Sequence, residues 1–231
     1  MIQVYADGAT FPELERYATD PKVAGFTTNP SLLAKIGVTN YAEFGRVAAA
    51  AVHPKPISFE VLSEDPTQIE WEAHRLQQWG TNVVVKVPIV SSTGASQFAV
   101  IHRLRRAGVA LNVTAVLTRQ DASTARLALE DWTASQPAIV SIFAGRIGDL
   151  EQDPCLAFDA ARGRRVTLLW ASTRSLGDLH RAAQAGAHII TMSPALIDKR
   201  AAMQGKSLAQ YARETVAQFT ADAQASGLTV S

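Results

Sequence analysis

The 231-residue sequence has a single cysteine, Cys155, and no long hydrophobic run. One cysteine excludes an internal disulfide and suits a reducing compartment, so we expect a cytoplasmic protein. The apolar runs are far shorter than the roughly 20 residues that a membrane-spanning helix needs. The first residues also lack the charged and apolar segments of a secretory signal. We therefore expect neither a membrane partner nor secretion.

The sequence has no strong excess of charge of either sign, because 22 basic residues stand against 21 acidic ones. The short basic clusters at 103–106 and 162–165 are separated, and such clusters are typical of solvated surface. We expect no nucleic-acid partner. The five histidines are scattered, and no His/Cys/Asp group has metal-ligand spacing. The sequence therefore predicts no metal site and no organic cofactor.

Short runs rich in Val, Ile and aromatic residues recur along the chain and predict strands. They lie at residues 2–6, 23–27, 56–61, 82–87, 109–113, 138–143, 165–171 and 187–192. Helix-length segments lie between most of them, and those at 65–80, 94–108 and 175–186 end at glycine. Alternating strands and helices indicate parallel βαβ units.

Eight such strands in a chain of this length predict an α/β fold, a single-domain (β/α)8 barrel over residues 1–231. An open doubly wound sheet is the alternative, and the lack of a glycine-rich loop after the first strand disfavours it. No linker, low-complexity tract or short repeat divides the chain. Apolar residues at helical spacing predict a last helix at about 207–223, which packs on the barrel or on a neighbouring subunit.

Polar residues gather where the predicted strands end, which is where barrel enzymes have their active sites. They are Asp7, Thr27, Asn29, Glu60, Lys86, Asn112, Thr114, Ser141, Arg146, Ser172 and Arg174. Residues two apart on a strand share a face, so Thr27 with Asn29, Asn112 with Thr114, and Ser172 with Arg174 form three such pairs. The pattern predicts a polar mouth above an apolar barrel.

Structural roles remain open for several of these residues. Asn29 before Pro30 is also typical of a helix cap, and Ser141 of a core hydroxyl. Arg146 has Asp149 nearby as a surface ion-pair partner. A buried ion pair between Glu60 and Lys86 is the strongest structural alternative, because charged groups inside apolar strands are rarely buried unpaired.

Lys86 stands out because it lies inside the apolar run "NVVVKVP" at 82–88, whereas every other lysine has a polar or turn-like context. Desolvation disfavours the ammonium form of a lysine, which leaves a free amine that attacks a carbonyl to form a Schiff base. The protonated Schiff base withdraws electrons from the adjacent carbon–carbon bond, so aldol cleavage or formation follows. Asp7 and Glu60 are the carboxylates placed for proton transfer.

The remaining polar residues suit a sugar phosphate. Asn29 and Asn112 carry amides that hold substrate hydroxyls, while Arg146, Arg174 and Ser172 suit a phosphate group.

The strand-end motifs resemble, in order, those of transaldolases. They read "VYADGA", "GFTTNPSLL", "SFEV", "VVVKVP", "LNVTAV", "SIFAGRIGD", "ASTRS" and "ITMSPALI", from about residue 2 to 197, and the TTNPSLL and GRIGD segments are the most specific. The resemblance implies a class I (β/α)8 enzyme that moves a dihydroxyacetone unit from a ketose phosphate, such as fructose 6-phosphate or sedoheptulose 7-phosphate, to an aldose acceptor. It also implies a place in carbohydrate metabolism, such as the pentose phosphate pathway.

The resemblance implies a role for each matched residue. Lys86 forms the Schiff base, Glu60 and Thr114 hold a water that shuttles protons, and Asp7 takes the proton of the cleaved hydroxyl. Asn29 and Asn112 bind the dihydroxyacetone hydroxyls near Ser141 and Thr27, and Arg146, Ser172 and Arg174 bind phosphate. The related fructose-6-phosphate aldolases typically have Gln at position 60 and Tyr at position 143, so Glu60 and Phe143 side with transaldolase.

Three positions depart from the usual family pattern, namely Ile142, Trp170 and Thr173. Trp170 and Thr173 flank the predicted phosphate site, so they leave acceptor choice open, including a specialised transaldolase of secondary sugar biosynthesis. A fructose-6-phosphate aldolase and a non-catalytic sugar-phosphate-binding barrel are further alternatives. Compact members of the family often form homo-oligomers through the C-terminal helix, and we expect the same here.

Overall fold

The computed structural model describes residues 2–8, 10–130 and 136–230. Contacts between Cα atoms divide the chain into two compact units, residues 1–196 and 197–231. Within the described ranges, no helix combines the length and apolar character needed to cross a bilayer.

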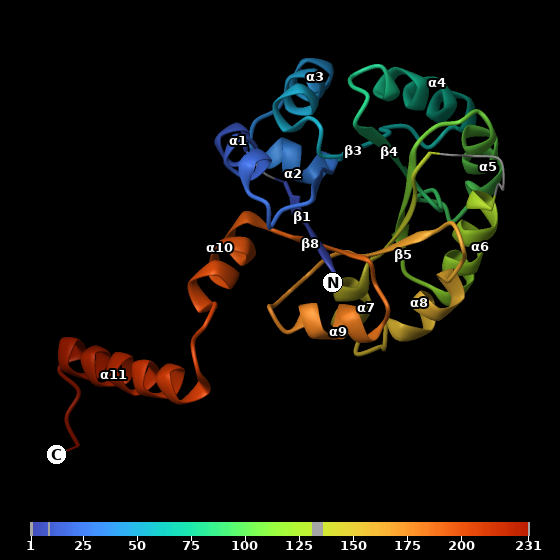
Figure 1. Cartoon of the computed structure of the whole chain (residues 1–231). Helices are drawn as coiled ribbons and strands as arrows, with labels where there is room; N and C mark the ends of the chain where they lie inside the picture. The colour runs from blue at the N-terminus through green and yellow to red at the C-terminus, as the bar shows by residue number, and fades with distance from the viewer. Residues whose placement is uncertain (1, 9, 131–135, 231) are drawn as a thin grey trace. The chain divides into compact units, whose positions relative to one another are not determined.

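The first unit holds eight parallel strands that close into a barrel in the order of the sequence, β1 to β8, with helices around them (Figure 1). The strands are β1 Gln3–Asp7, β2 Gly25–Thr27, β3 Ile57–Glu60, β4 Val83–Pro88, β5 Leu111–Val116, β6 Ala138–Ile142, β7 Thr167–Trp170 and β8 Ile189–Met192. Pairing of β1 with β8 closes the sheet, so the predicted (β/α)8 barrel is confirmed and the open doubly wound sheet is wrong.

Helices follow the strands in the alternation that the sequence predicted. They are α1 Phe11–Thr19, α2 Pro30–Lys35, α3 Tyr41–Val52, α4 Pro66–Gln77, α5 Phe98–Arg106, α6 Arg119–Leu129, α7 Ala144–Asp149, α8 Cys155–Ala161, α9 Asp178–Gln184, α10 Pro194–Met203 and α11 Leu208–Ser226. Proline in the first turn helps to start α1, α2 and α4, because its fixed φ suits that position and its missing N–H is not needed there. Gly108 and Gly186 follow α5 and α9 with φ of 80° and 76°. This left-handed conformation, which glycine adopts readily, ends both helices near the glycines where the sequence predicted their ends.

A cluster of buried side chains in the core comes from β1, β4, β6, β7 and β8 and from residues directly beside β5 and β7. Tyr5, Val84, Ala110, Ile139, Leu169, Ala171 and Ile189 form it. Val84 belongs to this interior cluster, and residues two apart on a strand share a face. Lys86 therefore points into the barrel, one step closer to its carboxyl end.

The second unit contains α11, which begins after Ser207, whose side chain accepts a hydrogen bond from the Gln210 N–H at 3.1 Å. It ends at Gly227, which has a φ of 66°. The helix covers the predicted segment 207–223, and none of its residues is buried. Its packing partner stays a prediction.

Candidate active site

A cavity of about 310 Å³ lies at the carboxyl ends of the barrel strands. Ten of the predicted site residues line it: Asp7, Thr27, Asn29, Lys86, Thr114, Ser141, Phe143, Arg146, Ser172 and Arg174. The predicted polar mouth therefore exists, and it brings together side chains from positions 7 to 174 of the chain. Glu60 and Asn112 do not line this cavity, although both contact residues that do.

Lys86 is buried, with 6% of its surface exposed, and its amine lies at the edge of the cavity. The Nζ atom donates a hydrogen bond to the Thr28 carbonyl oxygen at 2.9 Å and lies 3.1 Å from Glu60 Oε2. The side chains start from paired positions on neighbouring strands, because Glu60 and Lys86 are partners in the register of β3 and β4. An ammonium has three hydrogens, so these two partners leave one for the cavity.

The predicted ion pair between Glu60 and Lys86 is present together with a cavity beside the amine. The two interpretations of the sequence are therefore compatible. Both side chains have low exposure, 18% for Glu60 and 7% for Lys86, which strengthens their electrostatic attraction compared with a surface pair. Tyr41 donates a hydrogen bond to the Glu60 carbonyl oxygen at 2.9 Å and so fixes the end of β3.

Asp7 lines the same cavity at the end of β1. Burial raises the pKa of its carboxyl group, while the nearby Lys86 charge and a hydrogen bond from Thr27 oppose that rise. The hydrogen bond runs from Thr27 Oγ1 to Asp7 Oδ1 at 2.7 Å, and it orients the carboxylate. A carboxyl group with a raised pKa holds a proton more readily at working pH, which suits an acid–base role.

A buried chain of hydrogen bonds lies below the cavity. Ser141 Oγ donates to Asn112 Oδ1 at 2.6 Å, and Asn112 Nδ2 donates to Ser58 Oγ at 3.2 Å. Asn112 is fully buried, and its amide is hydrogen-bonded to Ser58 and Ser141. Substrate contact by Asn112 stays a prediction, whereas Ser141 both bonds Asn112 and lines the cavity.

Thr114 has an unusual position in β5. The register between β5 and β6 shifts between Val113 and Val116, and Ala115 has a positive φ of 57°. This irregularity interrupts the pairing of β5 with β6 at Thr114, as bulges do, while Thr114 stays paired with Pro88 of β4. Its Oγ1 atom is buried and finds no hydrogen-bond partner in the part of the chain that the structure describes. An unsatisfied hydroxyl at a cavity wall suits contact with a bound molecule.

Asn29 combines the two roles that the sequence left open. Its side chain accepts a hydrogen bond from the Leu32 N–H at 3.0 Å and caps α2, and it also lines the cavity. The cap uses the amide oxygen, so the amide nitrogen remains for a ligand.

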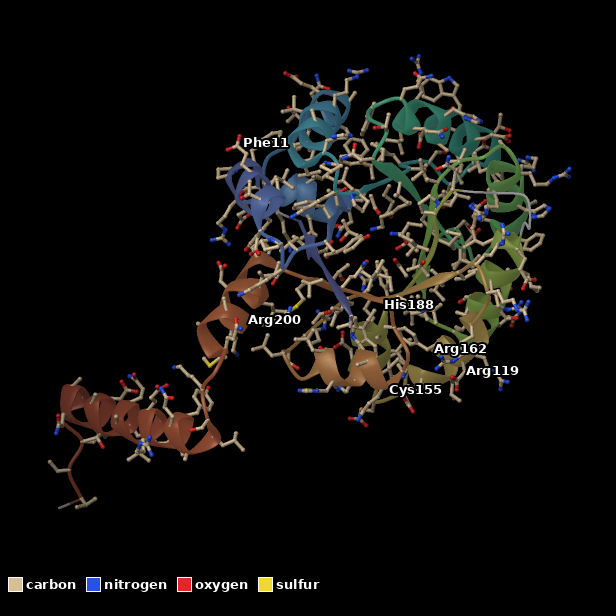
Figure 2. The ribbon with its side chains drawn as sticks, in the orientation of Figure 1. Phe11, Arg119, Cys155, Arg162, His188 and Arg200 are labelled. Atoms are coloured by element: carbon tan, nitrogen blue, oxygen red, sulfur yellow. The ribbon has the colours of Figure 1, made fainter. Side chains whose placement is uncertain are left out.

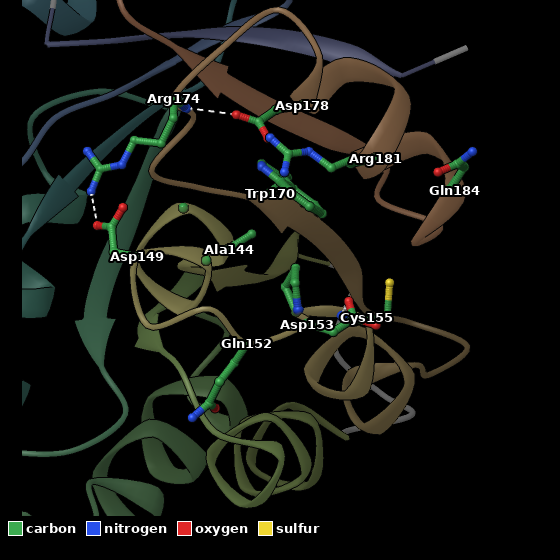
Figure 3. Close-up of a pocket in the computed structure, with 13 residues that line it drawn as sticks. Ala144, Asp149, Gln152, Asp153, Cys155, Trp170, Arg174, Asp178, Arg181 and Gln184 are labelled. Carbon is green, nitrogen blue, oxygen red and sulfur yellow. Dashed lines mark hydrogen bonds and ion pairs between the residues drawn. The ribbon is translucent and has the colours of Figure 1, made fainter.

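The predicted phosphate end of the cavity carries Arg146, Ser172 and Arg174. Arg146 lies over the Phe143 ring, 5.2 Å from its centroid. Arg174 lies 2.5 Å from Asp149 and its backbone N–H donates to Asp178, as Figure 3 shows. Asp149 thus pairs with Arg174, not with Arg146 as the surface alternative suggested.

Comparison with known proteins identifies the family. The family model described as transaldolase/fructose-6-phosphate aldolase matches residues 4–230. The chain belongs to this family. The family is one of aldolase-type enzymes.

Curated relatives and solved structures agree with this membership. A protein named "Probable transaldolase" from Pelotomaculum thermopropionicum is 32% identical over 83% of this chain and 86% of its own length. Another of that name from Dehalococcoides mccartyi is 29% identical over 83% of this chain and 86% of its own. Orotidine 5'-monophosphate decarboxylase from Metallosphaera sedula has a TM-score of 0.54 at 13% identity, covering 94% of this chain and 97% of that one, which shows the barrel fold alone.

Several residues of this transaldolase/fructose-6-phosphate aldolase family member line the cavity without having been predicted as site residues. They are Ser31, Leu32, Lys35, Leu169, Ala171, Thr173, Thr191 and Ser193. Ser31, Leu32 and Lys35 come from α2, which directly follows the Thr-Thr-Asn-Pro segment. The spacing of 31 and 35 by one helical turn is a signal that a search of strand ends alone does not detect.

The three departures from the family pattern have different surroundings. Ile142 is fully buried. Thr173 lines the cavity at the carboxyl ends of the strands, where its Oγ1 donates to the Thr191 carbonyl oxygen at 2.5 Å. Trp170 stacks on Phe158 with ring centroids 5.4 Å apart. Trp170 therefore faces the helical layer and not the cavity that Lys86 lines.

Trp170 lines a second, larger cavity of about 410 Å³, shown in Figure 3. Its charged lining residues are largely paired with each other, since Arg174 contacts Asp149 and Arg181 contacts Asp178. The Trp170 Nε1 atom is buried and has no hydrogen-bond partner among the described residues. No lysine lines this second cavity, so the larger of the two cavities is not the one beside Lys86.

No histidine is among the residues that line the cavity at the carboxyl ends of the strands. His188, labelled in Figure 2, accepts a hydrogen bond from the Leu168 N–H at 2.9 Å before β8, at the amino end of the strands. Within residues 2–8, 10–130 and 136–230, no group of three or more His, Cys, Asp or Glu side chains has the arrangement to hold a metal ion.

Proposed function

We propose that the protein is a transaldolase, which transfers a dihydroxyacetone unit from a ketose phosphate to an aldose phosphate through a Schiff base on Lys86. The observation that carries this proposal is the Lys86 amine itself. It is buried at the carboxyl end of the barrel, it borders a cavity of about 310 Å³, and it contacts Glu60 at 3.1 Å.

The first half of the reaction forms and uses the Schiff base. Glu60 is the base nearest to Lys86 and takes a proton from it, so that the neutral amine attacks the carbonyl carbon of the ketose. Loss of the carbonyl oxygen as water gives the protonated imine. Asp7 then takes the proton of the hydroxyl on the fourth carbon, the bond between the third and fourth carbons breaks, and its electron pair moves into the imine to leave an enamine.

The second half reverses these steps on a different aldehyde. The first aldose leaves, and the enamine carbon attacks the acceptor aldehyde. The carbonyl oxygen of the acceptor becomes an alkoxide, which takes the proton back from Asp7. Water then adds to the new imine and its carbon–nitrogen bond breaks, which releases the product ketose and restores Lys86. Glu60 and Thr114 hold the water for these proton transfers, which is consistent with the unsatisfied hydroxyl of Thr114.

The test is covalent trapping. Incubation with fructose 6-phosphate and borohydride reduces the imine to a stable secondary amine, and peptide mass mapping locates it. We expect the added mass on the peptide that contains Lys86 and no trapping in Lys86→Met. Label at another lysine, or none with wild-type protein, contradicts the mechanism.

A second measurement separates transaldolase from fructose-6-phosphate aldolase, the other activity in the family description. Transfer to erythrose 4-phosphate faster than release of free dihydroxyacetone supports the transaldolase assignment. Glu60 and Phe143 favour that outcome, because they are the residues that the transaldolase pattern has at these positions. A faster release would assign the protein to the aldolase branch.

A further inference from the structure

Lys35 lies on the wall of the catalytic cavity, although neither the strand-end pattern nor the family resemblance gave it a role. It is the last residue of α2. Together with Ser31 and Leu32 it forms the face of that helix that borders the cavity. Residues four apart lie on the same side of a helix, so Ser31 and Lys35 face the cavity together.

The helix that carries Lys35 is held firmly against the barrel. The Asn29 side chain caps its first turn through the Leu32 N–H at 3.0 Å. Leu32 packs so closely on Gly8 that a Cβ atom at position 8 would lie 2.5 Å from Leu32 Cδ1. Gly8 itself has a φ of 71°, which a side chain disfavours. The start of α2 is therefore fixed by contacts to the strand ends, and Lys35 has a defined place beside the cavity.

The positive charges that line the cavity differ in how far they are neutralised. Lys86 is paired with Glu60 at 3.1 Å, and Arg174 with Asp149 at 2.5 Å. Lys35 has no ion pair within the described parts of the chain. The same holds for Arg146, which contacts the Phe143 ring.

Two residues of the lining thus carry a positive charge without an ion pair among the described residues, Lys35 on α2 and Arg146 on α7. Among the residues that line the cavity, Asp7 is the acidic one, so these two cations outnumber the acidic side chains of the lining. A doubly charged anion is the ligand that two such cations favour. A phosphate group has that charge near neutral pH.

We propose that Lys35 binds the phosphate group of the sugar substrates together with Arg146, and so determines the preference for phosphorylated over neutral sugars. This inference rests on the proposed function. Donor and acceptor react through the same carbon–carbon bond in opposite directions, so their phosphate groups occupy the same end of the cavity. The long, flexible side chain of Lys35 lets its ammonium group reach an anion from the rim of the cavity. The Arg174 guanidinium is less free to move, because it is paired with Asp149.

The experiment compares Lys35→Gln and Lys35→Arg with wild-type protein. The matched control is Lys22→Gln, which removes the same charge from an exposed turn outside the cavity. We expect Lys35→Gln to raise the KM for erythrose 4-phosphate by roughly three- to tenfold, since exposed charge pairs contribute less than buried ones. The KM for unphosphorylated erythrose should not rise with it. Lys35→Arg should restore most of the difference, and Lys22→Gln should change neither value.

A direct binding measurement separates failure of this inference from failure of the proposed function. Calorimetric titration with inorganic phosphate needs no catalysis, and we expect weaker binding to Lys35→Gln than to wild type and Lys22→Gln. If borohydride traps no adduct in wild-type protein, the Schiff-base proposal fails while the calorimetry still tests Lys35. Equal phosphate affinity in all variants, or an equal rise in KM for erythrose and its phosphate, overturns the role of Lys35.

Discussion

In the proposed mechanism, Glu60 is both an ion-pair partner of Lys86 and a base. It lies 3.1 Å from the Lys86 amine and keeps 18% of its side chain exposed. Glu60→Gln preserves shape and hydrogen bonding but removes the carboxylate. We expect the rate of dihydroxyacetone transfer to fall by about 10²- to 10⁴-fold, the range typical for loss of a general acid–base group. Steady-state kinetics with fructose 6-phosphate and erythrose 4-phosphate measure this, and donor binding should persist.

Glu70→Gln is the matched control for that variant, because Glu70 lies on α4 and pairs with the exposed Arg103. It should leave transfer unchanged. If Glu60→Gln turns over like the wild type, Glu60 has only a structural role and another group must deprotonate Lys86.

Asp7 links activity to stability through its raised pKa. The folded protein keeps the Asp7 proton at pH values where the unfolded chain has released it, so folding binds protons in this window. The free energy of unfolding therefore falls as the pH rises from the ordinary aspartate value of 3.8 through the raised pKa of the folded state. Asp7→Asn removes this loss, so the variant should gain stability relative to wild type as the pH rises.

Thermal denaturation of both proteins at about pH 4 and pH 7 checks this. The melting temperature of Asp7→Asn minus that of wild type should be larger at the higher pH, while transfer activity is lost. A difference that is constant with pH, or that shrinks, would mean that Asp7 is not destabilised by burial.

The helix α2 is capped by Asn29, which also lines the cavity, so a change at this residue affects both stability and the site. Asn29→Ala should lower the free energy of unfolding by about 1 kcal/mol, the typical contribution of such a cap. Asn29→Ser keeps a capping oxygen but loses the amide nitrogen, so it should unfold like the wild type while binding the donor more weakly. Chemical denaturation and the KM for fructose 6-phosphate separate the two effects. If Asn29→Ser retains the wild-type KM, the Asn29 amide serves the helix alone.

The strands were predictable because each is a short run of β-branched and aromatic residues, and parallel closure then follows from the alternation with helices. The residues at which the strands and helices begin and end were not predictable in the same way. β5 was predicted at 109–113 but runs over Leu111–Val116, since the positive φ of Ala115 allows an irregular extension. The helix predicted at 94–108 begins only at Phe98, because Gly94 adopts a φ of 83° in a turn before it.

In the whole molecule, most of the predicted site residues line one cavity because a closed parallel barrel brings all carboxyl ends of its strands to one rim. Residues as far apart as Asp7 and Arg174 therefore line one cavity. The partners within the site were less predictable, since side-chain direction depends on local backbone. Ser172 has a φ of 63° and closely approaches Gly145, so β7 does not continue regularly to Arg174. Asp149 consequently contacts Arg174 and not Arg146.

The second unit, residues 197–231, has a helix without a buried face. Leu208, Val216 and Phe219 of α11 are exposed by 88%, 62% and 66%. At 100° per residue they lie on one side of the helix. Apolar stripes of this kind are typical of helices that are covered by another surface, and we propose that a second copy of the chain covers this one.

Association through α11 predicts that a charge on the apolar side reduces the oligomer. Phe219→Glu should lower the mass measured by light scattering, because burying an unpaired carboxylate opposes association. Ala217→Glu places the same charge on the opposite side of α11, 200° away from residue 219, and should keep the wild-type mass. Circular dichroism checks that both variants retain their helix content. A wild-type monomer would show that this stripe does not hold copies of the chain together. Equal masses for the two variants would show the same, since the variants differ only in which side of α11 bears the charge.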